Sequence, residues 1–204
     1  MEPSMPLHLE PHRTALVVVD PQNWLLAGPL APHSGEIVAR NCARLACALR
    51  PAGPVILVRV AFSDGYAEML RTPVDVGPQI PETAMSSEQL AFHPLVLEAG
   101  HDVIITKRQW SAFYGTELDL QLRRRGMSTI VLAGATTNFG VESTARDARQ
   151  NNYALIVAED ACAGIDADMH AFSITKILPR LARVRATSDV VAALDRQTAR
   201  ETSR

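Results

Sequence analysis

The sequence predicts one α/β domain in which helices cover both faces of a mainly parallel sheet. Two observations carry this prediction. Short, continuous apolar runs alternate with segments of helical spacing along the chain, and several runs lack the polar alternation of a half-exposed strand. Strand–helix–strand units connect by right-handed crossovers, which make the strands parallel and place helices on both faces. A length of 204 residues suits one such domain with one sizeable core.

The expected elements follow in chain order. Apolar runs predict six strands, at residues 14–19, 55–62, 101–106, 130–133, 153–158 and 183–186. Helical spacing predicts helices at 37–49, 117–125, 137–152 and 168–178, and a last one from Thr187 or Ser188 to about Leu194.

The remaining segments are expected to be irregular. Residues 1–13 are expected to form a poorly ordered lead-in, residues 14–194 the domain, and residues 195–204 a frayed tail. The stretch 63–94 is rich in proline and is predicted to be a long loop with short helical pieces that flanks the site.

The composition excludes several classes of partner. The formal net charge is −2 and the pI is about 6.3, so neither nucleic acid nor a membrane surface is expected as a partner. No apolar run reaches the length of a membrane span. The three cysteines, Cys42, Cys47 and Cys162, are odd in number and lack metal-type spacing, which predicts free thiols in a reducing cytoplasm.

Three features are expected to meet at one edge of the sheet. Asp20 directly follows the first predicted strand, Lys107 the third, and the turn 134–140 the fourth. The carboxyl ends of parallel strands share an edge, where α/β proteins bind ligands. Each feature also has an ordinary interpretation: Asp20 before Pro21 as a turn residue, and 134–140 as a common strand-to-helix turn. The convergence of an acid, a cation and a turn favours a site.

Four segments resemble a known family. VVVDPQN, ITKRQWSAFYGTELDLQLRRRG, LAGATTNFGVESTARDA and VAEDACA occur in the order found in the isochorismatase-like hydrolases of the cysteine hydrolase superfamily. These segments also resemble those of the YecD-type members, which are functionally uncharacterised. The resemblance implies a three-layer α/β/α Rossmann-like fold with a six-stranded, mainly parallel sheet. It also implies a small-molecule substrate and a homo-oligomer, either a dimer or a tetramer.

The resemblance also assigns catalytic positions. The family's Asp and Lys map onto Asp20 and Lys107, whereas its nucleophilic Cys falls on Gly140. A cis peptide that shapes the oxyanion hole maps onto Ala135–Thr136. Glycine has no side chain, so hydrolysis of an amide through a thioester is not expected. Cys162 is interpreted as a small buried residue rather than as a substitute nucleophile.

Isochorismatases proper also carry glycine at this position. They hydrolyse a vinyl ether: an aspartic acid protonates the alkene carbon and water captures the oxocarbenium. The resemblance therefore implies that Asp20 is the acid and that Lys107 either holds a substrate carboxylate or positions the acid. Burial would raise the pKa of Asp20 and Lys107 would lower it, which leaves the net direction open. The alternatives are a non-catalytic protein that binds a small ligand, and an amide hydrolase that uses water activated at Asp20.

The remaining site residues also come from the resemblance. The substrate-binding set is Gln22, Trp24, Phe113, Ala135, Thr136, Asn138 and Gly140. Trp24 and Phe113 are predicted to wall the pocket, with places in the core as the alternative. Isochorismatases typically have Tyr-Ala-His where this chain has Thr136, Thr137 and Asn138, so isochorismate itself is not implied.

No metal and no cofactor is expected. The Asp-x-His metal motif of nicotinamidases is not found between residues 62 and 93, and His93 is interpreted as structural.

Overall fold

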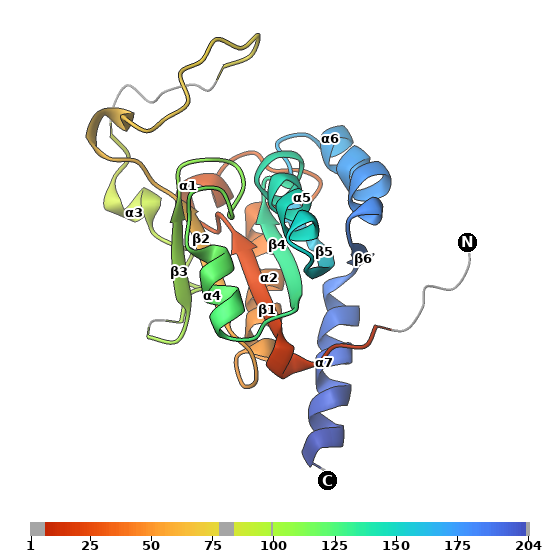
Figure 1. The fold of residues 1–204 in the computed structure, drawn as a ribbon. Coiled ribbons are helices and arrows are strands. Elements are labelled where there is room, and N and C mark those ends of the chain that lie inside the picture. Colours follow the sequence, from red (N-terminus) through yellow and green to blue (C-terminus); the bar gives the residue numbers. More distant parts are fainter. Residues whose placement is uncertain (1–6, 78–83, 99, 203–204) are drawn as a thin grey trace.

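A computed structural model describes residues 7–77, 84–98 and 100–202. Six strands form one sheet in the order β3-β2-β1-β4-β5-β6, and every neighbouring pair is parallel (Figure 1). The predicted fold class is confirmed. The strands are β1 (Thr14–Val19), β2 (Val55–Val60), β3 (Val103–Lys107), β4 (Thr129–Ala135), β5 (Ala154–Ala163) and β6 (Arg183–Arg185).

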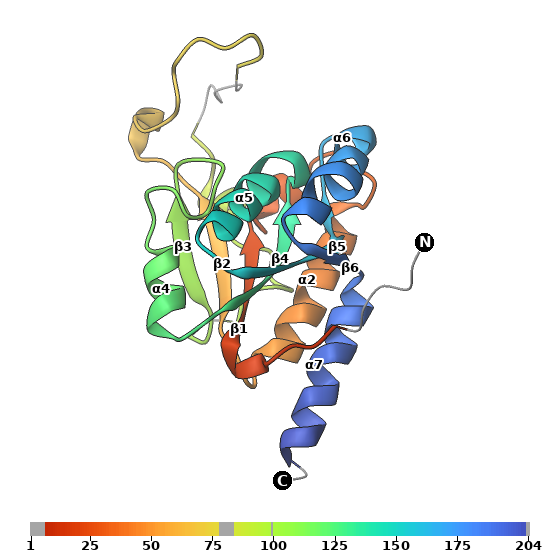
Figure 2. The same ribbon diagram turned by 45° about the vertical axis from the view of Figure 1, so that its right-hand side comes forward.

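Helices cover both faces of this sheet (Figures 1 and 2). The α-helices are α1 (Asn23–Leu26), α2 (Gly35–Leu49), α3 (Ser87–Leu90), α4 (Leu118–Arg124), α5 (Glu142–Gln150), α6 (Ala167–Phe172) and α7 (Thr187–Thr202). Shorter turns are η1 (Pro11–Arg13), η2 (Asp64–Tyr66), η3 (Thr137–Val141), η4 (Ser173–Ile177) and η5 (Leu178–Arg180). Helices α2 and α7 pack on one face, and α4 and α5 pack on the other.

The central strand β1 explains the continuous apolar run seen in the sequence. All six of its residues are buried. Leu16 and Val18 point into the core beneath α2 and α7, whereas Val17 and Val19 point into the core beneath α4 and α5. Because successive side chains of a strand alternate between faces, a strand covered on both sides must be apolar at every position.

The described residues near both ends of the chain, 7–13 and 195–202, are more regular than the sequence predicts. Leu7 and Leu9 are buried in the core beneath α2 and α7, so the expectation of a poorly ordered lead-in does not hold for residues 7–13. Helix α7 continues to Thr202 instead of ending near Leu194. The residues after Leu194 include no glycine or proline, so nothing in the sequence breaks the helix there.

The proline-rich stretch 63–94 has the predicted character of a loop with short helical pieces. Of its described residues, those of η2 and α3 are helical, and segment 63–77 projects away from the sheet (yellow, Figures 1 and 2). Ser86 and Gln89 begin α3 with reciprocal hydrogen bonds between side chain and backbone. Residues 78–83 lie outside the described part.

Candidate active site

The structure brings Asp20 and Lys107 together at the carboxyl edge of the sheet. Asp20 Oδ2 lies 2.8 Å from Lys107 Nζ, and the two side chains are only 9% and 2% exposed. Asp20 follows β1 and Lys107 ends β3, and β2 lies between these two strands. The long side chain of Lys107 therefore spans the end of β2. Lys107 Nζ also donates a hydrogen bond of 2.7 Å to the carbonyl of Trp110. The carboxyl group therefore faces a cation that is itself fixed.

The backbone of Asp20 turns sharply as it leaves β1. Its φ of +51° lies in the left-handed region, and its N–H donates to the carbonyl of Val58 on β2 at 2.8 Å. A positive φ is uncommon for a residue other than glycine, although aspartate tolerates it better than most. Such conformations persist where the surroundings enforce them, and they are frequent at functional sites.

The environment of Asp20 favours its protonated form. Burial raises the pKa of Asp20 to about 6, although the charge of Lys107 and its hydrogen bond act to lower it. The second carboxyl oxygen, Oδ1, is buried and has no hydrogen-bond partner among the described residues. A carboxyl with one oxygen held and the other unpartnered can carry a proton on the unpartnered oxygen. Desolvation therefore outweighs the lysine, which the sequence left open.

Gly140 lies directly against this pair. A Cβ added to Gly140 would lie 3.3 Å from Lys107 Nζ, 3.5 Å from Asp20 Oδ2 and 3.0 Å from Val19 Cγ1. Position 140 therefore faces both charged groups, as the sequence predicts for the place where the family's cysteine stands. Because glycine has no side chain, no side-chain atom of residue 140 stands between the backbone of the turn and the two charged groups.

The turn around Gly140 is held by backbone and side-chain contacts. The peptide Ala135–Thr136 is cis, at the position that the resemblance implied. The N–H groups of Phe139 and Val141 both donate to the carbonyl of Thr136. The Thr144 hydroxyl donates to the Gly140 carbonyl at 2.7 Å and accepts the N–H of Ala112 at 2.9 Å, which joins the turn to the loop after β3.

Gln22 is not available to a substrate, which corrects its predicted role. Its side chain is buried, and its Nε2 donates to the carbonyls of Val60 and Leu90 at 3.2 and 2.8 Å. Its Oε1 accepts the N–H of Val60 at 2.9 Å. Both amide hydrogens and the oxygen are therefore bonded to backbone, and Gln22 fastens the end of β2 to α3.

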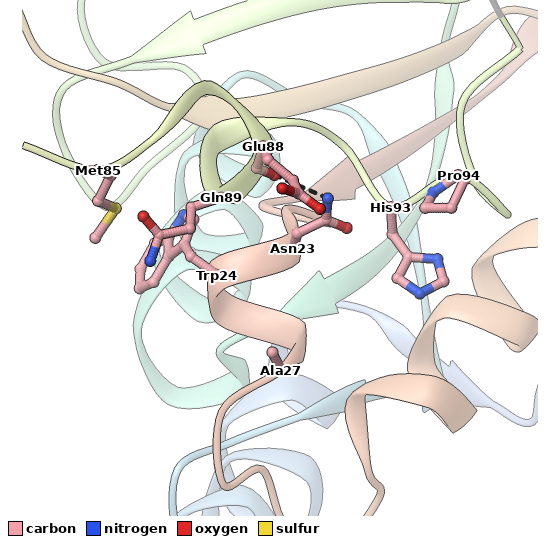
Figure 3. Close-up of a pocket in the computed structure, with 8 residues that line it drawn as sticks. All are labelled: Asn23, Trp24, Ala27, Met85, Glu88, Gln89, His93 and Pro94. Atoms are coloured by element: carbon pink, nitrogen blue, oxygen red, sulfur yellow. Dashed lines mark hydrogen bonds between the residues drawn. The ribbon is translucent and has the colours of Figure 1, made fainter.

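Trp24 lines a neighbouring groove rather than the Asp20–Lys107 pair. The groove has a volume of about 680 Å³ and runs between α1 and α3 (Figure 3). Its lining residues are Asn23, Trp24, Ala27, Met85, Glu88, Gln89, His93 and Pro94. Neither Asp20 nor Lys107 belongs to this lining. The prediction that Trp24 walls the reactive pocket is therefore corrected to a place beside it.

Phe113 takes the place in the core that was its predicted alternative, whereas substrate binding by Asn138 stays a prediction. The Phe113 ring packs 5.9 Å from the ring of Tyr153, which precedes β5 at the amino edge of the sheet, so Phe113 belongs to the core and not to the pocket wall. The Asn138 amide nitrogen contacts Met169 Sδ at 3.4 Å, which turns the side chain toward α6. Its Oδ1 is buried and without a partner among the described residues. Ala135 is buried and Thr136 half-buried beside it.

Two residues near the site were not among those predicted. Trp110 provides the carbonyl that holds Lys107, and its exposed ring packs 5.0 Å from the ring of Phe139, next to Gly140. Its place in the polar and aromatic loop after Lys107 was the available signal. His170 contacts the turn through Thr137, with 2.8 Å between His170 Nδ1 and Thr137 Oγ1. No local pattern links residues so far apart in the sequence.

Two further properties concern metals and membranes. Among the described residues, no three His, Cys, Asp or Glu side chains gather in a way that could hold a metal ion. No helix in residues 7–77, 84–98 and 100–202 is long and apolar enough to cross a membrane.

Comparison with known proteins shows the family to which the chain belongs. The model of the Isochorismatase domain family matches residues 14–189, and the chain belongs to that family. The uncharacterised isochorismatase family protein YecD of Escherichia coli O157:H7 is 48% identical over 191 residues, covering 92% of this chain and all of that protein. The ureidoacrylate amidohydrolase RutB of Methylobacterium radiotolerans is 33% identical, covering 76% of this chain and 69% of that protein.

A solved structure gives the same result. An isochorismatase family protein from Burkholderia thailandensis superposes with a TM-score of 0.88 at 44% identity, covering 94% of this chain and 100% of that one. These relatives place the chain in a family of hydrolases.

Proposed function

We propose that this protein hydrolyses a small molecule by acid–base chemistry at Asp20 and Lys107, without a cysteine nucleophile. One observation carries the proposal. The buried Asp20 carboxyl has a pKa raised to about 6 by burial and holds Lys107 through Oδ2. Its Oδ1 lies beside a glycine and has no hydrogen-bond partner in the described part of the chain. A general acid works best when its pKa lies near the working pH.

The reaction class that fits best is the hydrolysis of a vinyl ether. Protonated Oδ1 gives its proton to the terminal alkene carbon, a C–H bond forms from the π electrons, and the ether oxygen shares its lone pair with the adjacent carbon as an oxocarbenium ion. Water then adds to that carbon and its proton returns to the carboxylate. The hemiketal collapses to a ketone and an alcohol. Lys107 stabilises the carboxylate that exists between the two proton transfers.

The glycine supports this reaction over covalent catalysis. A thioester route needs a thiolate at position 140, and glycine supplies none. Cys42 and Cys162 are buried, and burial raises the pKa of the Cys162 thiol to about 12, so neither is a ready nucleophile.

A screen of vinyl ethers, isochorismate included, tests the proposal. The expected result is turnover that survives thiol alkylation and is lost in Asp20→Asn. In deuterium oxide the product should carry one deuterium on the newly protonated carbon. Turnover of no vinyl ether, or equal turnover by Asp20→Asn, would end the proposal. A vinyl ether that binds tightly and stays intact would instead support a non-catalytic binding protein.

A second candidate is amide hydrolysis by water activated at Asp20. The similarity to the amidohydrolase RutB favours it. The two candidates require different protonation states of Asp20. Vinyl-ether hydrolysis needs the protonated carboxyl as an acid, and amide hydrolysis needs the ionised carboxylate as a base. Activity should fall as the pH rises through about 6 if Asp20 is an acid, and should rise through the same pH if it is a base. Release of ammonia from ureido and amide compounds measures the second activity.

We also propose that the protein is a cytoplasmic homo-oligomer, either a dimer or a tetramer. The resemblance to the family motivates the proposal. The exposed apolar side chains of Ile165, Met169 and Phe172, which recur at helical spacing around α6, support it. Light scattering after size-exclusion chromatography measures the assembly, and a monomer at micromolar concentration would contradict the proposal.

A further inference from the structure

A buried histidine on α6 holds the first residue of the turn that carries Gly140. His170 Nδ1 lies 2.8 Å from the hydroxyl oxygen of Thr137. His170 is 6% exposed and Thr137 is fully buried, so water does not compete readily for this contact. Thr137 begins η3, directly after the cis peptide Ala135–Thr136.

The imidazole is neutral and packed in one orientation. Burial, with a smaller contribution from the charge of His33, lowers the pKa of His170 to about 4. The ring of His33 packs edge-on against that of His170, with the centroids 6.0 Å apart. A neutral imidazole can accept at Nδ1 from the threonine hydroxyl, or donate to it in the other tautomer. The contact is therefore satisfied in either tautomer.

The helix that carries His170 is itself fixed. The Asp166 side chain accepts the N–H of Met169 at 2.9 Å and caps α6. Met169 contacts the Asn138 amide. Met169 and His170 of α6 thus contact Asn138 and Thr137 of the turn, respectively.

We propose that His170 is a positioning residue that acts through Thr137. By holding the start of η3, it keeps position 140 facing Asp20 and Lys107. Thr144 holds the other end of the turn through the Gly140 carbonyl, so the two contacts together define where the turn lies. The proposal rests on the proposed function only in taking this edge of the sheet as the reactive site.

A reporter thiol at position 140 tests the placement of the turn without any substrate. The parent variant combines Gly140→Cys with Cys47→Ser, which removes the exposed thiol. Cys42 and Cys162 remain, and burial raises the pKa of both. The alkylation rate with iodoacetamide then reports the thiol beside Lys107, because a neighbouring ammonium favours the reactive thiolate.

Four further substitutions are compared in this parent. His170→Leu and Thr137→Val each remove one side of the contact, and His170→Asn keeps a hydrogen-bonding atom near the place of Nδ1. Thr175→Val is the matched control, because it removes a threonine hydrogen bond on η4 that does not involve the turn. Thr137→Val changes little volume and keeps the test valid if His170→Leu fails to fold.

The expected result is a fall of about tenfold in the alkylation rate at pH 7 for His170→Leu and for Thr137→Val. A tenfold fall corresponds to a loss of about one pKa unit of thiolate stabilisation by Lys107. The alkylation rate of His170→Asn should stay within about threefold of the parent, and that of Thr175→Val should not change. The double variant His170→Leu/Thr137→Val should react at nearly the same rate as either single variant, because both substitutions remove the same contact. Unchanged rates in both Thr137→Val and His170→Leu, or no rescue by asparagine, would overturn the proposal.

Failure here and failure of the proposed function are distinguishable. The thiol rate depends on the place of position 140 and requires no turnover. Loss of the proposed function would appear as absent vinyl-ether turnover by the wild-type chain, whatever the reporter shows.

Discussion

Asp20 and Gln22 follow the same strand and are both buried. In the described part of the chain, the polar atoms of the Gln22 side chain are all hydrogen-bonded, whereas one oxygen of the Asp20 side chain is not. The Gln22 amide bonds three backbone groups at the end of β2 and beside α3. The Asp20 carboxyl bonds Lys107 through one oxygen and leaves the other without a partner among the described residues. A fully bonded buried group stabilises the fold, whereas an incompletely bonded one with a raised pKa is a candidate for chemistry.

The largest effect should come from Asp20→Asn. The amide keeps the shape of the carboxyl but cannot give up a proton, so kcat/KM on a vinyl ether should fall by roughly 10²–10⁴-fold. Steady-state kinetics at pH 6 measure it. At pH 7 the variant should unfold at a lower urea concentration than the wild type, because the buried Lys107 ammonium loses its carboxylate partner, so kcat/KM is compared for the folded protein. Retention of more than a tenth of the activity would contradict the assignment.

Gln22→Leu should lower the stability of the fold and leave the activity of the folded protein nearly unchanged. It removes three hydrogen bonds and leaves the N–H of Val60 unsatisfied. The free energy of unfolding should fall by about 2–4 kcal/mol. Urea denaturation measures the loss, and kcat/KM of the folded fraction should change less than threefold. A variant with wild-type stability and no activity would show that Gln22 acts in the site after all.

The pH dependence separates the two residues further. Burial raises the pKa of Asp20 to about 6 in the folded state, above its value of about 3.9 when unfolded. The folded state therefore binds a proton more tightly, and the associated stability is present below pH 4 and lost as the pH rises through about 6.

Relative to Asp20→Asn, the wild type should lose on the order of 2–3 kcal/mol of stability over this range. Its kcat/KM should fall about tenfold for each pH unit above 6. Urea denaturation and initial rates at matched pH values measure both. Parallel stability curves for the wild type and Asp20→Asn would contradict the raised pKa.

The smallest effect should come from the contact between the turn and the loop after β3. Thr144→Val removes the hydroxyl that joins Gly140 to Ala112, so kcat/KM should fall about three- to tenfold. Thr144→Ser keeps the hydroxyl and should recover most of the loss. Equal kinetics for the valine and serine variants would show that the hydroxyl does not position the site.

The sequence predicts the fold and the meeting of Asp20 with Lys107 for the same physical reason. Buried parallel strands need apolar side chains on both faces, so their runs are visible, and their carboxyl ends share one edge. Any residue that directly follows such a strand lies at that edge. Asp20 and Lys107 are therefore found without knowledge of the packing.

The direction of individual side chains cannot be read in this way. Gln22 and Phe113 are placed near the pocket by the sequence, but Gln22 turns to the backbone of β2 and Phe113 packs on Tyr153. Their directions depend on where α3 and the start of β5 lie, which are long-range properties. The contact between His170 and Thr137 is missed for the same reason.

The most direct test is a titration of Asp20 itself. Carbon-13 NMR of aspartate-labelled protein, compared with Asp20→Asn, isolates the signal of this carboxyl and requires no substrate. A pKa near 6 is the predicted result, because burial outweighs the attraction of Lys107. An Asp20 signal that titrates at or below about 4, the ordinary value for a solvated aspartate, would contradict the account.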